Sequence, residues 1–282
     1  LEGRDPLTGV GLSEQNILFQ LVTFLIAGHE TTSGLLSFTL YELLKNPEAL
    51  RKAQQEVDEV LGGERPRFED MSRLSYIDQC LKESLRLWPI APLIAIYPRE
   101  DTLIGGRYFF GKDEMAFILL PMLNRDRKIW GEDGERFRPE RFHPEAFAAL
   151  PEHAWKPFGN GQRACLGRPF AMQESTLMLA MILQRFDLLE MNPPYTLQIK
   201  ETVTLKPGGF FIRARRRRVS LAKVPRPSSN KTQALSSKPL VGQGPSSSLV
   251  LFGSQNGAAE VFARRIARLV GARDVSPLDD YV

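Results

Sequence analysis

The chain has 282 residues, a formal net charge of +4, and 43% hydrophobic and 25% charged residues. This composition excludes disorder over most of the length and suffices for one large domain, or one domain plus part of another. The two cysteines, Cys80 and Cys165, form no closely spaced pair, which excludes a zinc framework and indicates a reducing, cytoplasmic compartment. Because the first residue is Leu1 rather than Met and the end at Val282 is abrupt, we expect a fragment.

The first predicted element is a long helix over Glu14–Lys45, with Ser13 as its N-cap and Asn46-Pro47 as its stop. It is apolar nearly all round, which predicts a helix buried in the core of a large domain. Its most apolar run, Ile17–Gly28, has twelve residues. That is too few to cross about 30 Å of hydrocarbon, so we expect no membrane anchor.

The middle of this helix reads Ala27-Gly28-His29-Glu30-Thr31-Thr32. Thr31 lies one turn beyond the small Ala27, on the same side of the helix. Buried Glu30 and Thr31 are costly in an apolar helix unless they have a purpose, and a Thr hydroxyl can free a backbone carbonyl for water. The alternative is a helix kink whose polar groups are satisfied locally.

Two further helices are expected, over Glu48–Leu61 and over Tyr76–Trp88. The first is opened by Pro47 and ended by two glycines, and the second stops before Pro89. Cys80 is expected to be a packed thiol. The pair Glu83 and Arg86 shares one helix face, which on its own is a common surface ion pair.

Four apolar residues follow the third helix, and they fit either a pocket for an apolar substrate or an ordinary core strand. They are Ile90, Ala91, Leu93 and Ile94. Short β-like runs occupy residues 93–121, an irregular region covers 124–164, a helix is predicted over Arg168–Arg185, and strand-like pieces cover 196–214. A compact irregular region of that length is usually functional.

The irregular region ends in a loop from Phe158 to Gly167 that carries Cys165 among three glycines, just before a helix. Glycines let the backbone approach a flat ligand closely, and a helix N-terminus stabilises a thiolate. Arg163 can meet an anion, and Phe158 can lie against a ring. A thiolate held this way can be the axial ligand of haem iron. The alternative is an ordinary buried cysteine beside a glycine turn.

Residues 219–248 are rich in Ser and Pro and predict a flexible linker. Five arginines lie between residues 213 and 218, before this segment. They predict a solvated tail or linker rather than a nucleic-acid site, because no aromatic residue interleaves with them.

Order is expected to resume with a strand at Leu249–Phe252, a loop, and a helix over Ala258–Val270. The loop is predicted to cradle a phosphate at the helix N-terminus, although a generic strand–turn–helix is the alternative. The residues concerned are Ser254, Gln255, Asn256, Gly257 and Ala258.

The pattern Phe158-x-x-Gly161-x-Arg163-x-Cys165-x-Gly167 resembles the cysteine-loop signature of the cytochrome P450 superfamily. The stretches Thr23–Phe38 and Lys156–Cys165 are similar to a subgroup, the self-sufficient fatty-acid hydroxylases of bacteria and fungi. In that subgroup the haem domain is fused to a diflavin reductase, an NADPH–cytochrome P450 reductase. The resemblance covers residues 1 to about 215.

This resemblance implies roles for the residues above. Cys165 would be the thiolate ligand to the iron of haem b, Arg163 would pair with a haem propionate, and Phe158 and Gly167 would complete the haem-binding loop. Thr31 and Glu30 would organise the water chain that delivers protons, with Ala27 over the haem. A buried structural triad and a substrate pocket are also implied. The triad is Glu83, Arg86 and Arg141, and the pocket is bordered by Ala27, Ile90, Ala91, Leu93 and Ile94.

The implied fold is mainly α with small β-sheets, the C-terminal half of the P450 fold, followed by a truncated α/β flavodoxin-like segment. The expected boundaries are 1–215 for the haem domain, 216–248 for the linker and 249–282 for the start of an FMN domain. The phosphate loop departs from the family where Ala258 replaces a frequent Thr. Without the family's N-terminal portion, we expect large exposed apolar surfaces, including the long helix.

The implied reaction is insertion of one oxygen atom from O2 into an unactivated C–H bond, by subterminal hydroxylation of a fatty acid. Electrons would come from NADPH through FAD and FMN of a fused or separate reductase. One alternative is a truncated chain that only binds haem or has no activity. A second is a basic adaptor that uses its arginine cluster to bind acidic partners. We expect neither nucleic acid nor a membrane among the partners.

Overall fold

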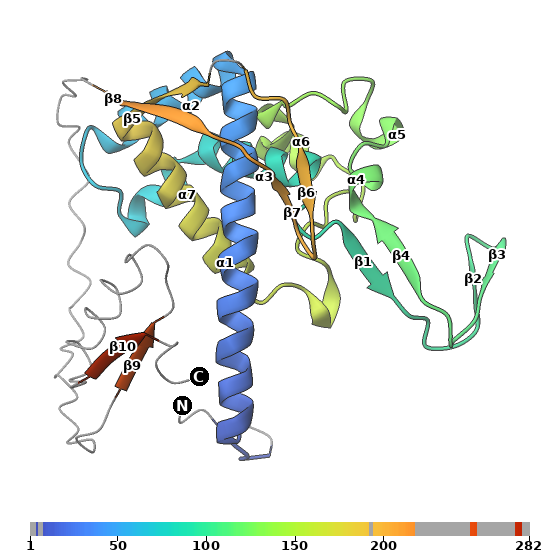
Figure 1. The fold of residues 1–282 in the computed structure, drawn as a ribbon. Coiled ribbons are helices and arrows are strands. Elements are labelled where there is room, and N and C mark those ends of the chain that lie inside the picture. Colours follow the sequence, from blue (N-terminus) through green and yellow to red (C-terminus); the bar gives the residue numbers. More distant parts are fainter. Residues whose placement is uncertain (1–3, 5–7, 192–193, 218–248, 253–273, 278–282) are drawn as a thin grey trace. The chain divides into compact units, whose positions relative to one another are not determined.

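The computed structural model describes residues 4, 8–191, 194–217, 249–252 and 274–277. The chain divides into two compact units, Leu1–Pro225 and Arg226–Val282, and each is considered by itself. The first unit is mainly helical and carries small two-stranded sheets at its edges (Figure 1).

Four long helices build the first unit: α1 (Glu14–Lys45), α2 (Pro47–Leu61), α3 (Ser75–Leu87) and α7 (Arg168–Arg185). Each lies within a residue or so of the bounds that the sequence predicts. The α1 helix starts at Ser13, whose hydroxyl accepts from the backbone N–H of Asn16 at 3.2 Å. The local start and stop signals are therefore sufficient to place all four helices.

Four antiparallel strand pairs surround these helices in the described part of the first unit. The pairs are β1 (Leu93–Ile96) with β4 (Ala116–Leu119), β2 (Thr102–Ile104) with β3 (Tyr108–Phe110), β5 (Phe186–Glu190) with β8 (Ile212–Arg216), and β6 (Ile199–Glu201) with β7 (Leu205–Pro207).

The region expected to be irregular contains several one-turn helices that the sequence did not predict. They are α5 (Arg127–Trp130), η2 (Pro139–Phe142), α6 (Pro144–Ala148) and η3 (Gly161–Arg163). Two further short helices that the sequence did not predict, η1 (Phe68–Arg73) and α4 (Leu120–Leu123), lie before that region. Strand β5 was also missed, because its run Phe-Asp-Leu-Leu-Glu does not alternate cleanly.

The hydrophobic core lies where the second half of α1 meets α2, α3 and α7. Its fully buried side chains include Phe38 of α1, Val57 of α2, Leu81 of α3 and Leu183 of α7. Cys80 is buried in the same cluster, as the sequence predicted. This core fixes the second half of α1 against α3, which is the arrangement that builds the site described below.

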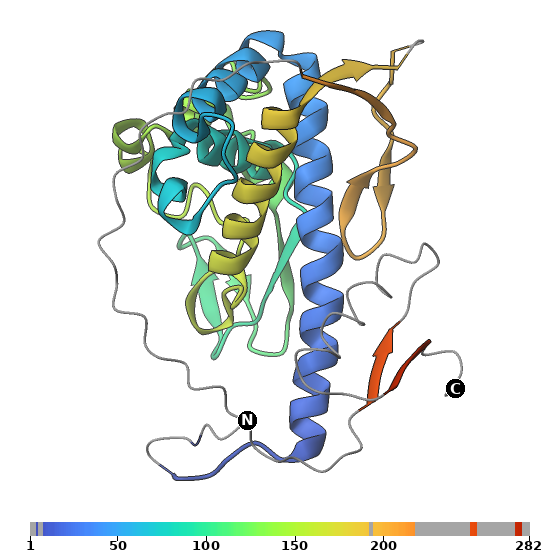
Figure 2. The same ribbon diagram turned by 90° about the vertical axis from the view of Figure 1, so that its left-hand side faces the viewer.

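The first half of α1 is exposed, so the prediction that the apolar run Ile17–Gly28 is buried in a core is wrong for this structure. The second expectation, that apolar surface of the long helix is exposed without the family's N-terminal portion, is confirmed. The apolar side chains from Leu18 to Ile26 are between 45% and 73% exposed. Figures 1 and 2 show α1 as one unbroken helix, and Figure 2 shows its second half with the other helices on one side and strands on the other. Composition reveals an apolar face but cannot say what packs on it. No helix in the described residues is both long and apolar enough to span a membrane.

Most of the arginine cluster is exposed to solvent, as predicted, but it lies on strand β8 and not in a tail or linker. Arg217 follows that strand and makes two bonds of 2.9 Å and 2.6 Å to the carboxylate of Asp58 on α2. Arg215 pairs with Asp187 on β5 at 3.2 Å. Ordered contacts thus continue past the expected boundary at residue 215, because acidic partners distant in the sequence meet the arginines.

The second unit is described only at β9 (Leu249–Phe252) and β10 (Asp274–Pro277), which pair in parallel. The strand at Leu249–Phe252 is the one predicted. The predicted phosphate loop, the predicted helix over Ala258–Val270 and all but the first two residues of the expected linker 216–248 lie outside the described residues.

Candidate active site

A cavity of about 440 Å³ lies between the middle of α1, the start of β1 and the cysteine loop. Most of its lining is apolar. The lining includes nine residues predicted for the site: Ala27, Thr31, Ile90, Ala91, Leu93, Ile94, Phe158, Arg163 and Cys165. Segments more than 130 residues apart in the sequence therefore form one pocket.

The α1 wall of the cavity is shaped by Thr31 and Ala27. The Thr31 hydroxyl donates a hydrogen bond to the Ala27 carbonyl at 2.6 Å, across one helical turn. This bond places the hydroxyl at the cavity wall and gives the Ala27 carbonyl a second donor besides the helix N–H. The small Ala27 leaves open space opposite the cysteine loop.

The opposite wall is the loop that carries Cys165. The backbone N–H of Cys165 donates to the Phe158 carbonyl at 2.8 Å, which closes the loop. Gly159 and Gly161 have φ values of +74° and +62°, a conformation that side chains disfavour and glycine allows. The loop thus presents the thiol towards the cavity, ahead of α7. Gly167 caps α7 behind Cys165 and does not line the cavity in the described residues.

Phe158 is held by a cluster of aromatic and cationic side chains. Trp155 meets Phe158 edge to face with ring centroids 6.3 Å apart, and its indole N–H donates to the Lys82 carbonyl of α3 at 3.3 Å. The guanidinium of Arg168 lies 5.6 Å from the Phe158 ring centre. These contacts fix the ring that lines the cavity beside Cys165, and the sequence analysis did not identify Trp155 or Arg168.

Glu30 is placed differently from the expectation. It is not among the cavity-lining residues of the described chain. Its carboxylate pairs with the ammonium group of Lys206 on β7 at 2.6 Å. The hydrogen bond and charge of Lys206 lower the pKa of Glu30, and the small desolvation of the carboxyl opposes this shift. The pair lies at the side of α1 that faces the β6–β7 hairpin.

The three residues expected to form a structural triad lie together behind the cavity. Arg86 binds both carboxylate oxygens of Glu83 at 2.7 Å and 2.8 Å, and Arg141 lies 3.5 Å from Glu83. Burial raises the pKa of the Glu83 carboxyl, and the bonds and charge of Arg86 oppose that shift. Asp133 pairs with Arg141 at 2.7 Å and is a further member that the sequence analysis missed.

This network anchors the one-turn helices to α3. Arg86 donates to the carbonyls of Asn124 and Gly134 at 2.7 Å and 2.6 Å, and Arg141 donates to the Trp130 carbonyl at 2.8 Å. Buried carbonyls without helix partners need such donors. The irregular chain leading to the cysteine loop is thereby held in a single position.

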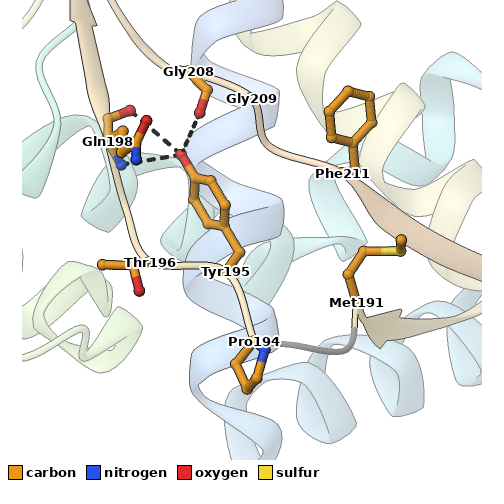
Figure 3. Close-up of a pocket in the computed structure, with 8 residues that line it drawn as sticks. All are labelled: Met191, Pro194, Tyr195, Thr196, Gln198, Gly208, Gly209 and Phe211. Carbon is orange, nitrogen blue, oxygen red and sulfur yellow. Dashed lines mark hydrogen bonds between the residues drawn. The ribbon is translucent and has the colours of Figure 1, made fainter.

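A second hollow, shown in Figure 3, is lined by residues around Tyr195 and Phe211. The Tyr195 hydroxyl donates to the Gly208 carbonyl at 2.8 Å and accepts from the Gln198 N–H at 3.1 Å. The hydroxyl, the carbonyl and the N–H group therefore have hydrogen-bond partners in one another, so the hydroxyl has a structural role in joining the ends of the β6–β7 hairpin.

The side chains around the first cavity fit a particular kind of cofactor. Cys165 is a soft sulfur donor, Arg163 is a cation suited to a carboxylate, and the remaining walls are mostly apolar. A flat iron macrocycle with carboxylate side groups matches this donor set, and a thiolate is an established axial ligand of haem. The residues around this cavity thus match those of haem-thiolate proteins as a class.

The chain belongs to the cytochrome P450 family, whose sequence profile, described as Cytochrome P450, matches residues 2–214. It is 54% identical over 218 residues to a self-sufficient cytochrome P450 monooxygenase of Aspergillus terreus, covering 77% of this chain and 21% of that protein.

Two bacterial relatives match more of the chain. Identity is 46% over 290 residues with bifunctional cytochrome P450/NADPH–P450 reductase 2 of Bacillus subtilis, covering 100% of this chain and 27% of the relative. It is 49% over 273 residues with the bifunctional enzyme of Bacillus cereus, covering 93% and 25%. The chain thus spans about a quarter of the length of the curated relatives it matches.

Proposed function

We propose that this chain is the cysteine-loop half of a haem-thiolate monooxygenase that inserts one oxygen atom from O2 into a C–H bond. The observation that carries the proposal is the meeting of Cys165, Thr31 and an apolar wall in one cavity. An iron ligand, a proton-handling hydroxyl and room for an apolar substrate are the parts that such chemistry needs. When bound, haem supplies the activation of oxygen.

Each of the site residues would have a distinct role in this reaction. The Cys165 thiolate would ligate the iron, Arg163 would neutralise a haem propionate, and Phe158 would shield the sulfur. The Thr31 hydroxyl, now bonded to the Ala27 carbonyl, would hold a water from which protons are delivered. Glu83, Arg86 and Arg141 would act only by holding the chain that leads to the loop.

The proposed substrate is a fatty acid, hydroxylated at a subterminal carbon. The apolar lining at Ile90, Leu93 and Leu35 suits a hydrocarbon chain and offers it no polar partner. Adding a medium- or long-chain fatty acid to the haem-loaded full-length protein should perturb the haem absorbance as water leaves the pocket. Titration with the matching alcohol tests whether the carboxylate is needed, and an unchanged spectrum with both would refute an apolar-chain substrate.

The longer protein is proposed to take electrons from NADPH through FAD and FMN. This proposal rests on the bifunctional relatives, in which a cytochrome P450 and an NADPH–P450 reductase are named together and whose similarity to this chain extends beyond residue 217. The loop Ser254–Ala258 would then hold the FMN phosphate. The alternative, for the 282 residues taken alone, is a truncated chain that only binds haem or has no activity.

The decisive measurement is the carbon monoxide difference spectrum of the reduced protein, produced with a haem supply. A thiolate ligand moves the Soret band strongly to the red, and Cys165→Ala should abolish that band. Cys80→Ala is the matched control, because Cys80 is buried away from the cavity. A band that persists in Cys165→Ala would refute the assigned ligand.

A band absent from the 282-residue chain but present in the longer protein would favour the alternative for this chain. Absence from both would remove the monooxygenase proposal.

A further inference from the structure

The ion pair between Glu30 and Lys206 joins two segments that are 176 residues apart in the sequence. The Glu30 Oε1 atom and the Lys206 Nζ atom lie 2.6 Å apart, and the two side chains are 36% and 37% exposed. Glu30 directly precedes Thr31, the residue whose hydroxyl lines the cavity. The pair therefore acts on the residue next to the proposed proton-handling group.

The backbone of Lys206 is held in place by contacts of its strand with the rest of the fold. Its strand β7 lies against α1, and Figure 2 shows the β6–β7 hairpin alongside that helix. The Leu205 N–H donates to the Ile90 carbonyl at 2.9 Å. The Leu205 carbonyl comes so close to α1 that a Cβ built on Gly34 would lie 3.2 Å from it.

This docking brings the hairpin to the helix one turn beyond Glu30. Ile90, which receives the Leu205 bond, also lines the cavity. The strand that carries Lys206 is thus tied on one side to α1 and on the other to the cavity wall. Movement of the hairpin would change the Glu30 contact and the wall together.

The pair constrains Glu30 in two ways. The carboxylate is directed to β7, and in the described chain Glu30 does not line the cavity. The titratable groups that face it are Lys206 from β7 and His29 from α1, and the hydrogen bond and charge of Lys206 lower the pKa of Glu30 most. A carboxylate that is paired and deprotonated is a poor proton donor.

We propose that Lys206 is a positioning residue: its ion pair restrains the Glu30 carboxylate outside the cavity, and Glu30 takes part in proton delivery only when the pair opens. This rests on the proposed function for its consequence, but the restraint itself does not. A partly exposed pair contributes little to stability. Its removal should therefore alter the behaviour of Glu30 far more than it alters folding.

The restraint can be tested without haem, by titrating the Glu30 carboxyl with carbon-13 NMR in the folded chain. Lys206→Met should shift the pKa of Glu30 upward towards its ordinary value, and Lys206→Arg should restore it. The matched control is Lys200→Met, because Lys200 is the exposed cross-strand partner of Lys206. An unshifted Glu30 pKa in Lys206→Met would overturn the restraint.

The consequence is tested in the haem-loaded longer protein, with coupling of NADPH oxidation to product measured across pH. Lys206→Met should shift the pH profile of coupling, and the shift should vanish when Glu30→Gln is already present. Lys200→Met should leave the profile unchanged. An equal effect of Lys206→Met in both backgrounds would show that Lys206 acts by another route.

These results separate the two proposals. Loss of the red-shifted carbon monoxide band would refute the monooxygenase assignment while leaving the NMR result valid. A normal band with no dependence of the pH profile on Glu30 would refute this inference alone.

Discussion

Glu42 is a buried carboxyl group on α1 that the proposed chemistry does not use. It is 7% exposed, and it accepts hydrogen bonds from the Trp88 indole N–H at 2.7 Å and from the Asn46 amide at 3.3 Å. Burial raises its pKa above the ordinary value of 4.5, and the Trp88 bond opposes this shift. The folded protein therefore holds a proton on Glu42 more tightly than the unfolded chain does.

We expect Glu42→Gln to stabilise the fold at neutral pH. Because the folded-state pKa is raised, the contribution of Glu42 to stability is present below pH 4.5 and is lost as the pH rises through the raised pKa. Gln keeps an acceptor for Trp88 and cannot ionise. Urea unfolding should show a gain on the order of 1 kcal/mol at pH 7, and none at pH 4.

The control for this prediction is Glu48→Gln, since Glu48 is largely exposed on α2. It should leave the pH dependence unchanged. A stability gain in Glu42→Gln that is the same at pH 4 and pH 7 would contradict ionisation as the cause.

At the scale of elements, the long helices are bounded by local chemistry. The α2 helix ends at Gly62, which has φ +52°, and its N–H donates to the Asp58 carbonyl at 3.0 Å. Glycine adopts this left-handed conformation without the steric conflict that a Cβ introduces. The turn after α2 therefore depends on glycine, and it directs the chain towards η1 and α3.

The same substitution should have opposite effects at two glycines. Gly62→Ala should cost about 1 kcal/mol, because alanine disfavours the left-handed region. Gly28→Ala should stabilise by about 1 kcal/mol, because Gly28 lies inside α1 with open space where its Cβ would stand. Free energies of unfolding, measured in urea for both variants, show whether each change stabilises or destabilises the protein. Destabilisation by both changes would mean that Gly28 has a packing role.

For the first unit as a whole, the main departure from an ordinary globular surface is the exposed first half of α1. Its apolar side chains include Leu18 and Leu25, the latter 73% exposed. These residues lie two turns apart on one face of the helix. A continuous apolar surface of this kind promotes association in water.

We expect Leu18→Gln combined with Leu25→Gln to reduce self-association of the 282-residue chain. Gln is a good helix former, so the helix should persist. Sedimentation velocity over a range of concentrations measures the change. Phe68→Gln is the control, because Phe68 is 69% exposed but lies on η1 rather than α1. Equal association of the double variant and the unaltered chain would exclude this surface as the cause.

The sequence by itself determined the four long helices and the identity of the cysteine loop. Ser13, Pro47, Gly62 and Arg168 mark helix boundaries through interactions within one or two turns, which sequence patterns record directly. The loop around Cys165 was recognisable because its glycines and its thiol lie within ten residues. The one-turn helices between residues 120 and 163 were missed, because tertiary bonds to Arg86 and Arg141 hold them and no local periodicity does.

Only the tertiary structure decided which residues meet across long distances. It directed Glu30 to Lys206 rather than to the cavity, supplied Asp133 as a partner for Arg141, and placed Arg217 on Asp58. It also showed that the exposed part of α1 is its first half, Leu18 to Ile26, while the second half is packed in the core. A side chain's type sets what it can bind, but the packing of helices and strands sets what it reaches. Such pairings cannot be read from the order of residues along the chain.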